Sequence, residues 1–184
     1  MTEKEKAMAG LEFRRGDEEL KKQRDRAELI CFELNNTPPD QPEKRKELLL
    51  QLIKDAANEG CTIKTPFICE YGDYISFGKN FFANCNCKLM DGGRITFGDN
   101  VFIGPDCTFV TVVHPIDPER RNAGYQTFRP VTVGSNVWFG AGVIVCPGVT
   151  IGDNCTIGAG SVVVRDIPAN TFAAGNPCAV IKEI

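Results

Sequence analysis

Six hexapeptides follow one another without a gap in the second half of the chain: Val133-Gly-Ser-Asn-Val-Trp, Phe139-Gly-Ala-Gly-Val-Ile, Val145-Cys-Pro-Gly-Val-Thr, Ile151-Gly-Asp-Asn-Cys-Thr, Ile157-Gly-Ala-Gly-Ser-Val and Val163-Val-Arg-Asp-Ile-Pro. Each opens with an aliphatic or aromatic residue, and glycine follows that residue in four of the six. A period of six fits neither an α-helix nor a long flat strand, and it is typical of a parallel β-helix. We therefore predict a mainly β fold, a solenoid whose opening residues point inward and stack. A β-sandwich also has short strands and frequent turns, but nothing in it would keep one phase through six repeats.

The repeat begins well before Val133. Three hexads share one phase from Tyr71 to Lys88, the phase slips by two residues at Asp91-Gly-Gly, and the pattern resumes at Phe97. It disappears again in the polar segment His114-Pro-Ile-Asp-Pro-Glu-Arg-Arg-Asn-Ala-Gly-Tyr-Gln-Thr-Phe-Arg-Pro. A long polar excursion inside a tight repeat is more often functional than a packing device. The two phase breaks, at 91–93 and at about 114–130, are therefore where we expect the chemistry.

Residues 1–58 differ from the rest because they are rich in charge and poor in glycine. Apolar residues at helical spacing predict one amphipathic helix from about Asp17 to Asn35 and a second from about Pro42 to Asn58. Prolines at 38 and 39 separate them, and Gly60 ends the second. We expect these helices to cap the open end of the solenoid. The expected organisation is thus a helical segment, 1–58, followed by the solenoid with its C-terminal tail, 59–184.

Composition excludes several classes of protein. A net charge of −3 and an isoelectric point near 5.3 argue against a general nucleic-acid binder, which needs a basic face to neutralise phosphates. No apolar run approaches the ~20 residues of a membrane span. The start, Met1-Thr-Glu-Lys-Glu-Lys, lacks the apolar core of a signal peptide, so we expect a cytoplasmic protein.

Nine cysteines raise the question of a metal site or of disulfides. No pair has Cys-x-x-Cys spacing, and the odd total does not suit a complete disulfide framework. Cys87, Cys107 and Cys155 instead occupy the small position four places after an opening residue. We predict that they act as small hydrophobic residues in a reducing compartment.

Hexads of this form, with a His-Pro loop before them and Gly175-Asn-Pro after them, resemble the hexapeptide-repeat acyltransferases. Among these, the chain resembles the bacterial maltose/galactoside O-acetyltransferase group over essentially all of its 184 residues. The resemblance implies a left-handed parallel β-helix with three hexads per triangular turn. It also implies a homotrimer with active sites between subunits, acetyl-CoA as co-substrate, and transfer of its acetyl group to a sugar hydroxyl of the maltose, glucose or galactoside type. In that group the N-terminal segment also walls the acceptor site.

His114 is the only histidine, and it opens the excursion. The loop His114-Pro-Ile-Asp resembles the catalytic loop of the group, which implies that His114 is the general base that deprotonates the acceptor hydroxyl. Histidine suits this role near neutral pH. By position, the backbone N–H of Ala141 is the implied donor to the oxyanion. The zinc carbonic anhydrases of the same fold use three histidines, so we expect no metal here.

The implied acceptor site centres on Asn84, in Phe81-Phe-Ala-Asn-Cys-Asn. Its amide can donate and accept hydrogen bonds to a sugar, although an asparagine at a corner in the left-handed conformation would read the same way. Asp91 and Glu70 are further acceptor candidates, since carboxylates accept strong hydrogen bonds from hydroxyls. Gly92 stands where some relatives carry a second aspartate. Asp17 and the stretch Phe13-Arg-Arg are additional candidates for this site.

The implied acetyl-CoA positions combine small and basic residues: Ala141, Ala159, Val164, Arg165, Ala179 and Lys182. Small residues would let pantetheine lie along a coil edge, and Arg165 and Lys182 would face the nucleotide phosphates. Val164 and Ala179 stand where relatives have a hydroxyl and an arginine, which predicts a weaker hold on phosphate. Trp138 faces out of its hexad, toward either a subunit contact or the cofactor.

Two other functions compete with a sugar O-acetyltransferase. One is acetylation of a xenobiotic such as an antibiotic on the same fold, but those relatives lack the N-terminal helical segment. The other is a non-catalytic solenoid scaffold, which would place no demand on a His-Pro loop. Release of free thiol from acetyl-CoA, measured against a panel of sugars and antibiotics, separates all three.

Overall fold

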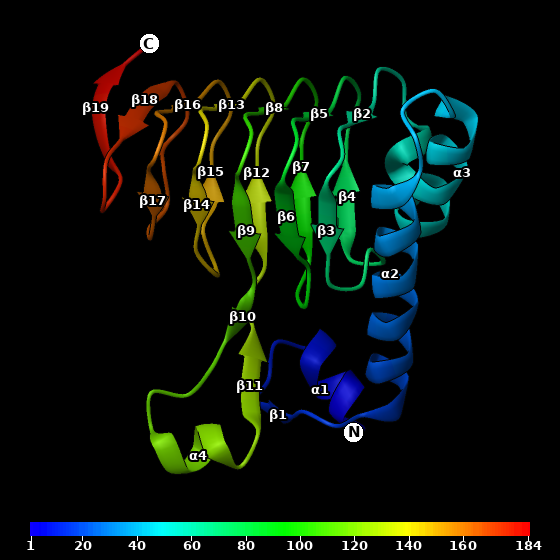
Figure 1. Cartoon of the computed structure of the whole chain (residues 1–184). Coiled ribbons are helices and arrows are strands. Elements are labelled where there is room, and N and C mark those ends of the chain that lie inside the picture. Colours follow the sequence, from blue (N-terminus) through cyan, green and yellow to red (C-terminus); the bar gives the residue numbers. More distant parts are fainter.

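The computed structural model describes residues 1–184 as a stack of triangular coils with helices at one end (Figure 1). Three parallel sheets form the sides, and the chain visits each in turn. We call them the β4, β5 and β6 sheets. The β4 sheet contains β4 (Ile75–Phe77), β7 (Ile95–Phe97), β12 (Val131–Val133) and β15 (Thr150–Ile151). The arrangement is a β-solenoid, as the hexad period predicts, and specifically a left-handed β-helix, as the resemblance implies.

The other two sheets hold the remaining coil strands. The β5 sheet contains β2 (Thr62–Ile63), β5 (Phe82–Ala83), β8 (Phe102–Ile103), β13 (Trp138–Phe139), β16 (Thr156–Ile157), β18 (Thr171–Ala174) and β19 (Ala179–Glu183). The β6 sheet contains β3 (Phe67–Cys69), β6 (Cys87–Met90), β9 (Thr108–Val110), β14 (Ile144–Val145) and β17 (Val162–Val163). Among the strands of these three sheets, only β19 runs antiparallel to its neighbour, and it closes the C-terminal end of the stack.

The opening residues of the hexads fill the interior, which confirms that prediction. All six are at most 2% exposed: Val133, Phe139, Val145, Ile151, Ile157 and Val163. Cys87, Cys107 and Cys155 are buried with them, and all nine cysteines are free thiols. Phenylalanine rings pack edge to face along the axis, with centroids 5.1 Å apart from Phe97 to Phe109 and again from Phe109 to Phe139. Stacked apolar layers of this kind supply most of the stabilisation of a solenoid.

An asparagine ladder marks the corner between the β4 and β5 sheets. Five asparagines occupy it, all with φ between 54° and 60°: Asn80, Asn100, Asn136, Asn154 and Asn170. Each of the first four donates its side-chain amide to the next, at 2.8–3.0 Å. Asparagine tolerates the left-handed backbone that this tight corner requires.

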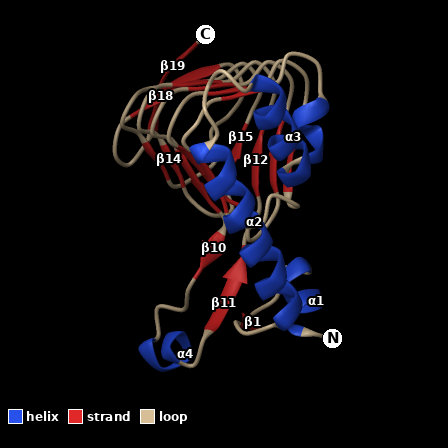
Figure 2. Cartoon of the chain, turned by 45° about the vertical axis from the view of Figure 1, so that its right-hand side comes forward, coloured by secondary structure: helices blue, strands red, loops and turns tan.

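The N-terminal helices cover the first coil (Figure 2). α2 (Glu18–Asn36) and α3 (Pro42–Leu52) place buried residues in the same apolar cluster as the coils. The second helix ends earlier than the predicted 58, because Ile53 adopts an extended backbone with φ −134° and buries its side chain. A short 3₁₀ helix, Lys54–Ala57, follows. A further helix, α1 (Glu3–Met8), was not predicted; it begins with a capping box formed by Thr2 and Glu5.

The excursion forms an arm, residues 112–130, which projects from the stack. It consists of β10 (Val112–Val113), α4 (Pro118–Asn122) and β11 (Tyr125–Phe128), and it is therefore more ordered than its irregular sequence indicated. β11 pairs antiparallel with β10 on one side and with β1 (Phe13–Arg14) on the other. Figure 1 shows this small sheet and α1 beside the lower half of α2. None of the helices is both long and apolar enough to cross a membrane.

Candidate active site

His114 lies at the mouth of a polar cavity in the arm. It follows β10 directly, is exposed, and lines a cavity of about 390 Å³. The other lining residues come from three places: Arg15 after β1, Arg121 and Asn122 in α4, and Gly124 before β11. Pairing of β1 with β11 brings the N-terminal segment to this point. No apolar residue lines the cavity.

The loop after His114 is held from below by α4. Nη1 of Arg121 donates to the backbone carbonyls of Pro115 and Ile116, both at 3.0 Å. Asp117 caps the helix by accepting the backbone N–H of Glu119 at 3.2 Å. His114 therefore sits between a strand and a braced loop, which fixes its backbone while its ring remains open to a substrate.

A second, more apolar groove lies on the outer face of the β5 sheet. It has a volume of about 450 Å³, and its lining residues come from successive coils: Phe82, Asn84, Phe102, Ile103, Gly104, Pro105, Trp138, Phe139, Gly140 and Ala141. Phe82, Phe102 and Trp138 occupy equivalent outward positions in paired strands. Trp138 is 57% exposed. Such a row of rings provides an aromatic wall for an apolar or planar ligand.

Asn84 and Ala141 belong to one corner, between the β5 and β6 sheets. The backbone N–H of Ala141 donates no hydrogen bond within the chain, and Ala141 is exposed. Oδ1 of Asn84 accepts the backbone N–H of Cys85 at 2.9 Å, which leaves its amide NH₂ free. Asn84 is not in the left-handed conformation, which belongs to Asn86 at φ 62°. A free amide N–H and a free side-chain amide thus face the same groove.

Asp91 is buried at 0% exposure. Its Oδ1 accepts the backbone N–H groups of Glu70 and Tyr71 at 2.9 Å, and its Oδ2 accepts that of Tyr74 at 3.2 Å. Burial raises the pKa of Asp91, and the backbone hydrogen bonds lower it in part. These bonds order the turn from β3 to β4.

Glu70 is half-buried beside this turn, and its carboxylate makes no hydrogen bond within the chain. Burial raises its pKa, Asp91 adds to the rise, and Arg24 opposes it. Asp17 has a different setting, since its carboxylate caps α2 by accepting the N–H groups of Glu19 and Leu20. These hydrogen bonds lower the pKa of Asp17, and the one from the N–H of Leu20 has the greatest effect.

The six residues implied for acetyl-CoA lie on three parts of the fold. Ala141 and Ala159 stack at one corner, where the carbonyl of Ala141 accepts the N–H of Gly160 at 2.8 Å. Val164 and Arg165 follow β17 at the next corner, across the β6 sheet. Ala179 and Lys182 belong to β19. All six are exposed: Ala141, Ala159, Val164, Arg165, Ala179 and Lys182.

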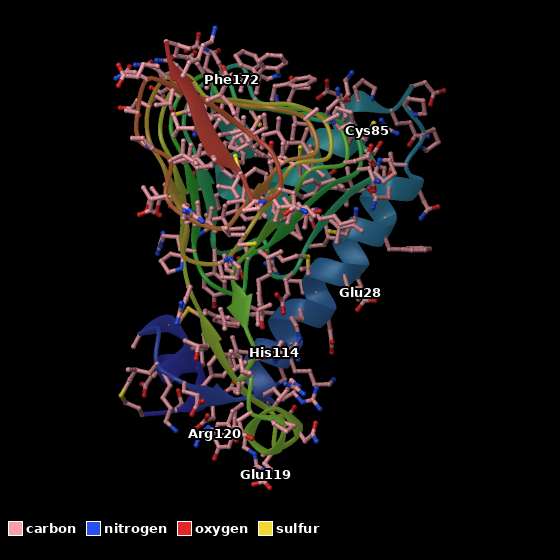
Figure 3. The ribbon with its side chains drawn as sticks, turned by 90° about the vertical axis from the view of Figure 1, so that its left-hand side faces the viewer. Glu28, Cys85, His114, Glu119, Arg120 and Phe172 are labelled. Atoms are coloured by element: carbon pink, nitrogen blue, oxygen red, sulfur yellow. The ribbon has the colours of Figure 1, made fainter.

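The His114 cavity and the groove share no residue. In Figure 3, His114 lies on the arm, above Arg120 and Glu119 of α4, while Cys85, the neighbour of Asn84, lies high on the coil stack. A single chain therefore presents two separate candidate sites.

Sequence reasoning did not single out Arg121, Asn122 or Gly124 of the His114 cavity, nor Phe82 and Phe102 of the groove. Two signals pointed toward them. The aromatic residues recur at the sixth position of their hexads, and the pair Arg120-Arg121 stands in the excursion. No group of three His, Cys, Asp or Glu side chains is arranged to hold a metal ion.

Two family models match parts of this chain, and known proteins match it over its whole length. The model of the "Maltose acetyltransferase hexapeptide capping motif" matches residues 6–56, and that of the "Bacterial transferase hexapeptide (six repeats)" matches residues 130–165. A Staphylococcus aureus (strain Mu50) protein that carries the name acetyltransferase is 50% identical over 185 residues, which cover 100% of this chain and 92% of that protein. The chain belongs to the maltose acetyltransferase family of hexapeptide-repeat transferases.

Two solved structures of acetyltransferases place the fold in the same family. A maltose O-acetyltransferase from Clostridium difficile 630 is 46% identical with a TM-score of 0.92, over 100% of this chain and 98% of that one. A galactoside acetyltransferase in complex with coenzyme A is 41% identical with a TM-score of 0.95, over 100% of this chain and 92% of that one. The capping motif of this maltose acetyltransferase family coincides here with α1, α2 and α3.

Proposed function

We propose that this chain is an acetyl-CoA-dependent O-acetyltransferase that acetylates a hydroxyl of a sugar, with His114 as the general base. The observation that carries the proposal is this pair of separate sites, which we interpret as two half-sites of one active site. One holds the only histidine in a polar cavity, and the other holds a free amide N–H and a free side-chain amide beside an aromatic wall. Together they supply what direct attack of a hydroxyl on a thioester needs: a base, an oxyanion donor and a surface for both substrates.

The chemistry follows from these groups. His114 accepts the proton of the acceptor hydroxyl while the hydroxyl oxygen forms a bond to the carbonyl carbon of the acetyl thioester. Negative charge develops on the carbonyl oxygen, where the N–H of Ala141 donates to it. The carbon–sulfur bond then breaks, and the CoA sulfur leaves with the proton that His114 holds. The products are the O-acetyl sugar and free CoA.

A homotrimer with sites between subunits would unite the half-sites. The arm of one chain would carry His114 to the groove of its neighbour, since the two do not meet within one chain. The exposed aromatic wall of Phe82, Phe102 and Trp138 supports this arrangement, because such a surface is normally covered by a partner or a ligand.

Acetyl-CoA would lie along the corner of Ala141 and Ala159, with Arg165 and Lys182 near its phosphates. The galactoside acetyltransferase relative was solved with coenzyme A, which supports this co-substrate. Val164 and Ala179 complete the proposed set. We propose no metal, since the mechanism needs no Lewis acid.

On the acceptor side we propose direct contacts from Asn84 and Glu70, whose polar groups are free. Asp91 and Asp17 have oxygens already committed to backbone N–H groups, so we propose that they position the turn at Glu70 and the start of α2. The segment 1–58 would then serve both as cap and as acceptor wall, with 59–184 as the solenoid. Nine free thiols and no disulfide support a reducing, cytoplasmic location.

The test is acetylation by the purified protein, followed as free CoA by chromatography, against maltose, glucose, a galactoside and an aminoglycoside or chloramphenicol antibiotic. We expect turnover with a sugar and none with the antibiotics. His114→Ala should lower kcat by ~10²–10⁴ with little change in the KM of acetyl-CoA. Activity of His114→Ala within threefold of wild type on a good acceptor would remove the base from the mechanism.

A further inference from the structure

Four arginines belong to the two segments that form the His114 cavity, and two of them, Arg15 and Arg121, line it. Arg15 is the one whose guanidinium has no partner. Nε of Arg14 donates to the carbonyl of Ala123 at 2.8 Å, and Arg120 forms an ion pair with Glu12. Arg121 donates to the loop carbonyls described above. The side chain of Arg15 makes no hydrogen bond and no ion pair, although it lines the cavity beside His114.

The stem of Arg15 is nevertheless held in place. Its backbone N–H donates to the carbonyl of Gly124 at 2.9 Å, next to the register of β1 with β11. Its aliphatic carbons pack on Gly124, since a Cβ added there would lie 3.1 Å from Cγ of Arg15. Gly124 also has φ +87°, which a side chain would strain. The chain thus fixes the base of this side chain and leaves the charged end free.

The charge balance of the cavity is positive. Arg15 and Arg121 line it, and no carboxylate does. Of the acidic residues in the neighbouring segments, Glu12 pairs with Arg120 and Asp117 caps the N-terminus of α4. Glu119 is exposed on α4 and does not line the cavity. The positive balance contrasts with the whole chain, whose net charge is −3. A free guanidinium in such a place matches the planar geometry of a carboxylate or a phosphate.

We infer that Arg15 binds an anionic group of the acceptor, so that the preferred acceptor is a sugar phosphate or a sugar acid rather than a neutral sugar. The inference rests on the proposed function, because it names the substrate class of the same site. Phosphate and carboxylate share the chemistry that the guanidinium recognises. Either would place the negative group beside Arg15 while a hydroxyl of the same sugar reaches His114.

The experiment uses the full-length protein and three acceptors that differ in one group: glucose, glucose 6-phosphate and glucuronate. We expect kcat/KM for at least one anionic acceptor to exceed that for glucose by about tenfold or more. Arg15→Gln should lower kcat/KM for the anionic acceptor by roughly tenfold to a hundredfold, with little effect on glucose. The KM of acetyl-CoA should not move. Which acceptor loses more identifies phosphate or carboxylate as the group bound.

Lys22→Gln is the matched control, because Lys22 is exposed on α2 with no ion pair and its loss changes the net charge equally. It should leave the preference unchanged, and equal unfolding temperatures for the three proteins would show that folding is intact. A preference for glucose, or an anionic preference that survives Arg15→Gln, would overturn the inference while the acetyltransferase activity stands. A rise in the KM of acetyl-CoA in Arg15→Gln would assign Arg15 to the CoA phosphates instead.

Calorimetric binding of glucose 6-phosphate and of glucuronate gives a readout that needs no turnover. We expect wild type to bind at least one of them and Arg15→Gln to bind it at least tenfold more weakly. Equal affinities in the two proteins, or no binding of either ligand to wild type, would reject the inference. If no sugar is acetylated but this binding is lost in Arg15→Gln, the proposed function fails and the anion site remains.

Discussion

Oδ1 of Asp91 accepts the backbone N–H of Tyr71 at 2.9 Å, across 20 positions of sequence. With the N–H groups of Glu70 and Tyr74, this carboxylate ties the turn after β3 to the turn after β6, one coil away. The polar turn beside the candidate acceptor site is therefore set by a residue that is itself inaccessible.

Asp91→Ala should lower the free energy of unfolding by roughly 2–4 kcal/mol, because three backbone N–H groups lose their acceptor in a buried place. Denaturant unfolding measures the change. Asp99→Ala is the control, since Asp99 is exposed and accepts the single N–H of Lys79. If both variants lost the same free energy of unfolding, the three hydrogen bonds at Asp91 would contribute no more than the single one at Asp99.

Glu70→Gln should stabilise the protein at neutral pH and lose that advantage in acid. The pKa of Glu70 is raised above its ordinary 4.5, chiefly by burial, so the folded state binds this proton more tightly than the unfolded chain. The stabilisation that comes from binding this proton is therefore fully present below pH 4.5, and it is lost as the pH rises through the raised pKa of Glu70. Glutamine stays neutral throughout. The unfolding temperatures of wild type and Glu70→Gln, measured from pH 4 to 8, should diverge as the pH rises. Parallel curves would contradict a raised pKa at Glu70.

Mixed trimers should recover activity from two inactive chains. His114→Ala removes the base, and Ala141→Glu, at an exposed position, should block the groove and the oxyanion donor. If each site takes His114 from one chain and Ala141 from the next, random mixing leaves about a quarter of the sites intact. Co-expression followed by the CoA assay measures this recovery. Mixed trimers as inactive as their parents would place the whole site within one chain.

Asn84 and Lys182 should separate the two substrates. Asn84→Ala should raise the KM of the sugar or lower kcat by a few-fold to about tenfold, since a lost neutral hydrogen bond is worth ~0.5–1.5 kcal/mol. Lys182→Ala should instead raise the KM of acetyl-CoA, and the effect should shrink as salt increases. Initial rates over both substrates decide it. Crossed effects, with Asn84 changing chiefly the KM of acetyl-CoA and Lys182 chiefly that of the sugar, would mean that the two substrates have been assigned to the wrong residues.

Gly92→Ala should destabilise the protein because a Cβ there would overlap the ring of Phe128, which is 3% exposed and packs edge-on against Phe13 with centroids 4.7 Å apart. The loss should be about 1–3 kcal/mol, the usual cost of overpacking. Phe128→Leu in the same chain should recover part of it by vacating space. If the double variant is no more stable than the sum of the two singles predicts, the residues are not coupled.

The solenoid could be predicted from the sequence because its period is local. The residue that opens a hexad must be apolar whatever the rest of the chain does, so the burial of Val133 and Ile157 could be predicted from their positions in the repeat. The end of α3 could not be read in this way. Helical spacing continues past Leu52, and only the packing of Ile53 against the coils decides that the helix stops there.

The candidate site was harder to predict because its residues meet through long-range pairing. His114 and Asn84 stand at breaks or corners of the repeat, which is a local signal. Arg15 joins His114 only because β1 pairs with β11, more than a hundred residues later. Strand pairing between two short irregular segments leaves no periodic trace, so the positive charge of that cavity became visible only in the fold.

The asparagine ladder connects positions 20, 36, 18 and 16 residues apart, with the same side-chain contact at every step. Each coil must therefore bring an asparagine back to this corner, but the number of residues between successive asparagines can vary. The longest interval is the one that contains the arm. Closing a longer loop adds little entropy cost. An arm of another length or sequence could therefore be grafted between Asn100 and Asn136 while the spine stays in register. The coils thus form a constant scaffold, and the arm is the part that can change. A protein with this fold could bind a different acceptor by changing its arm while its coils stay the same.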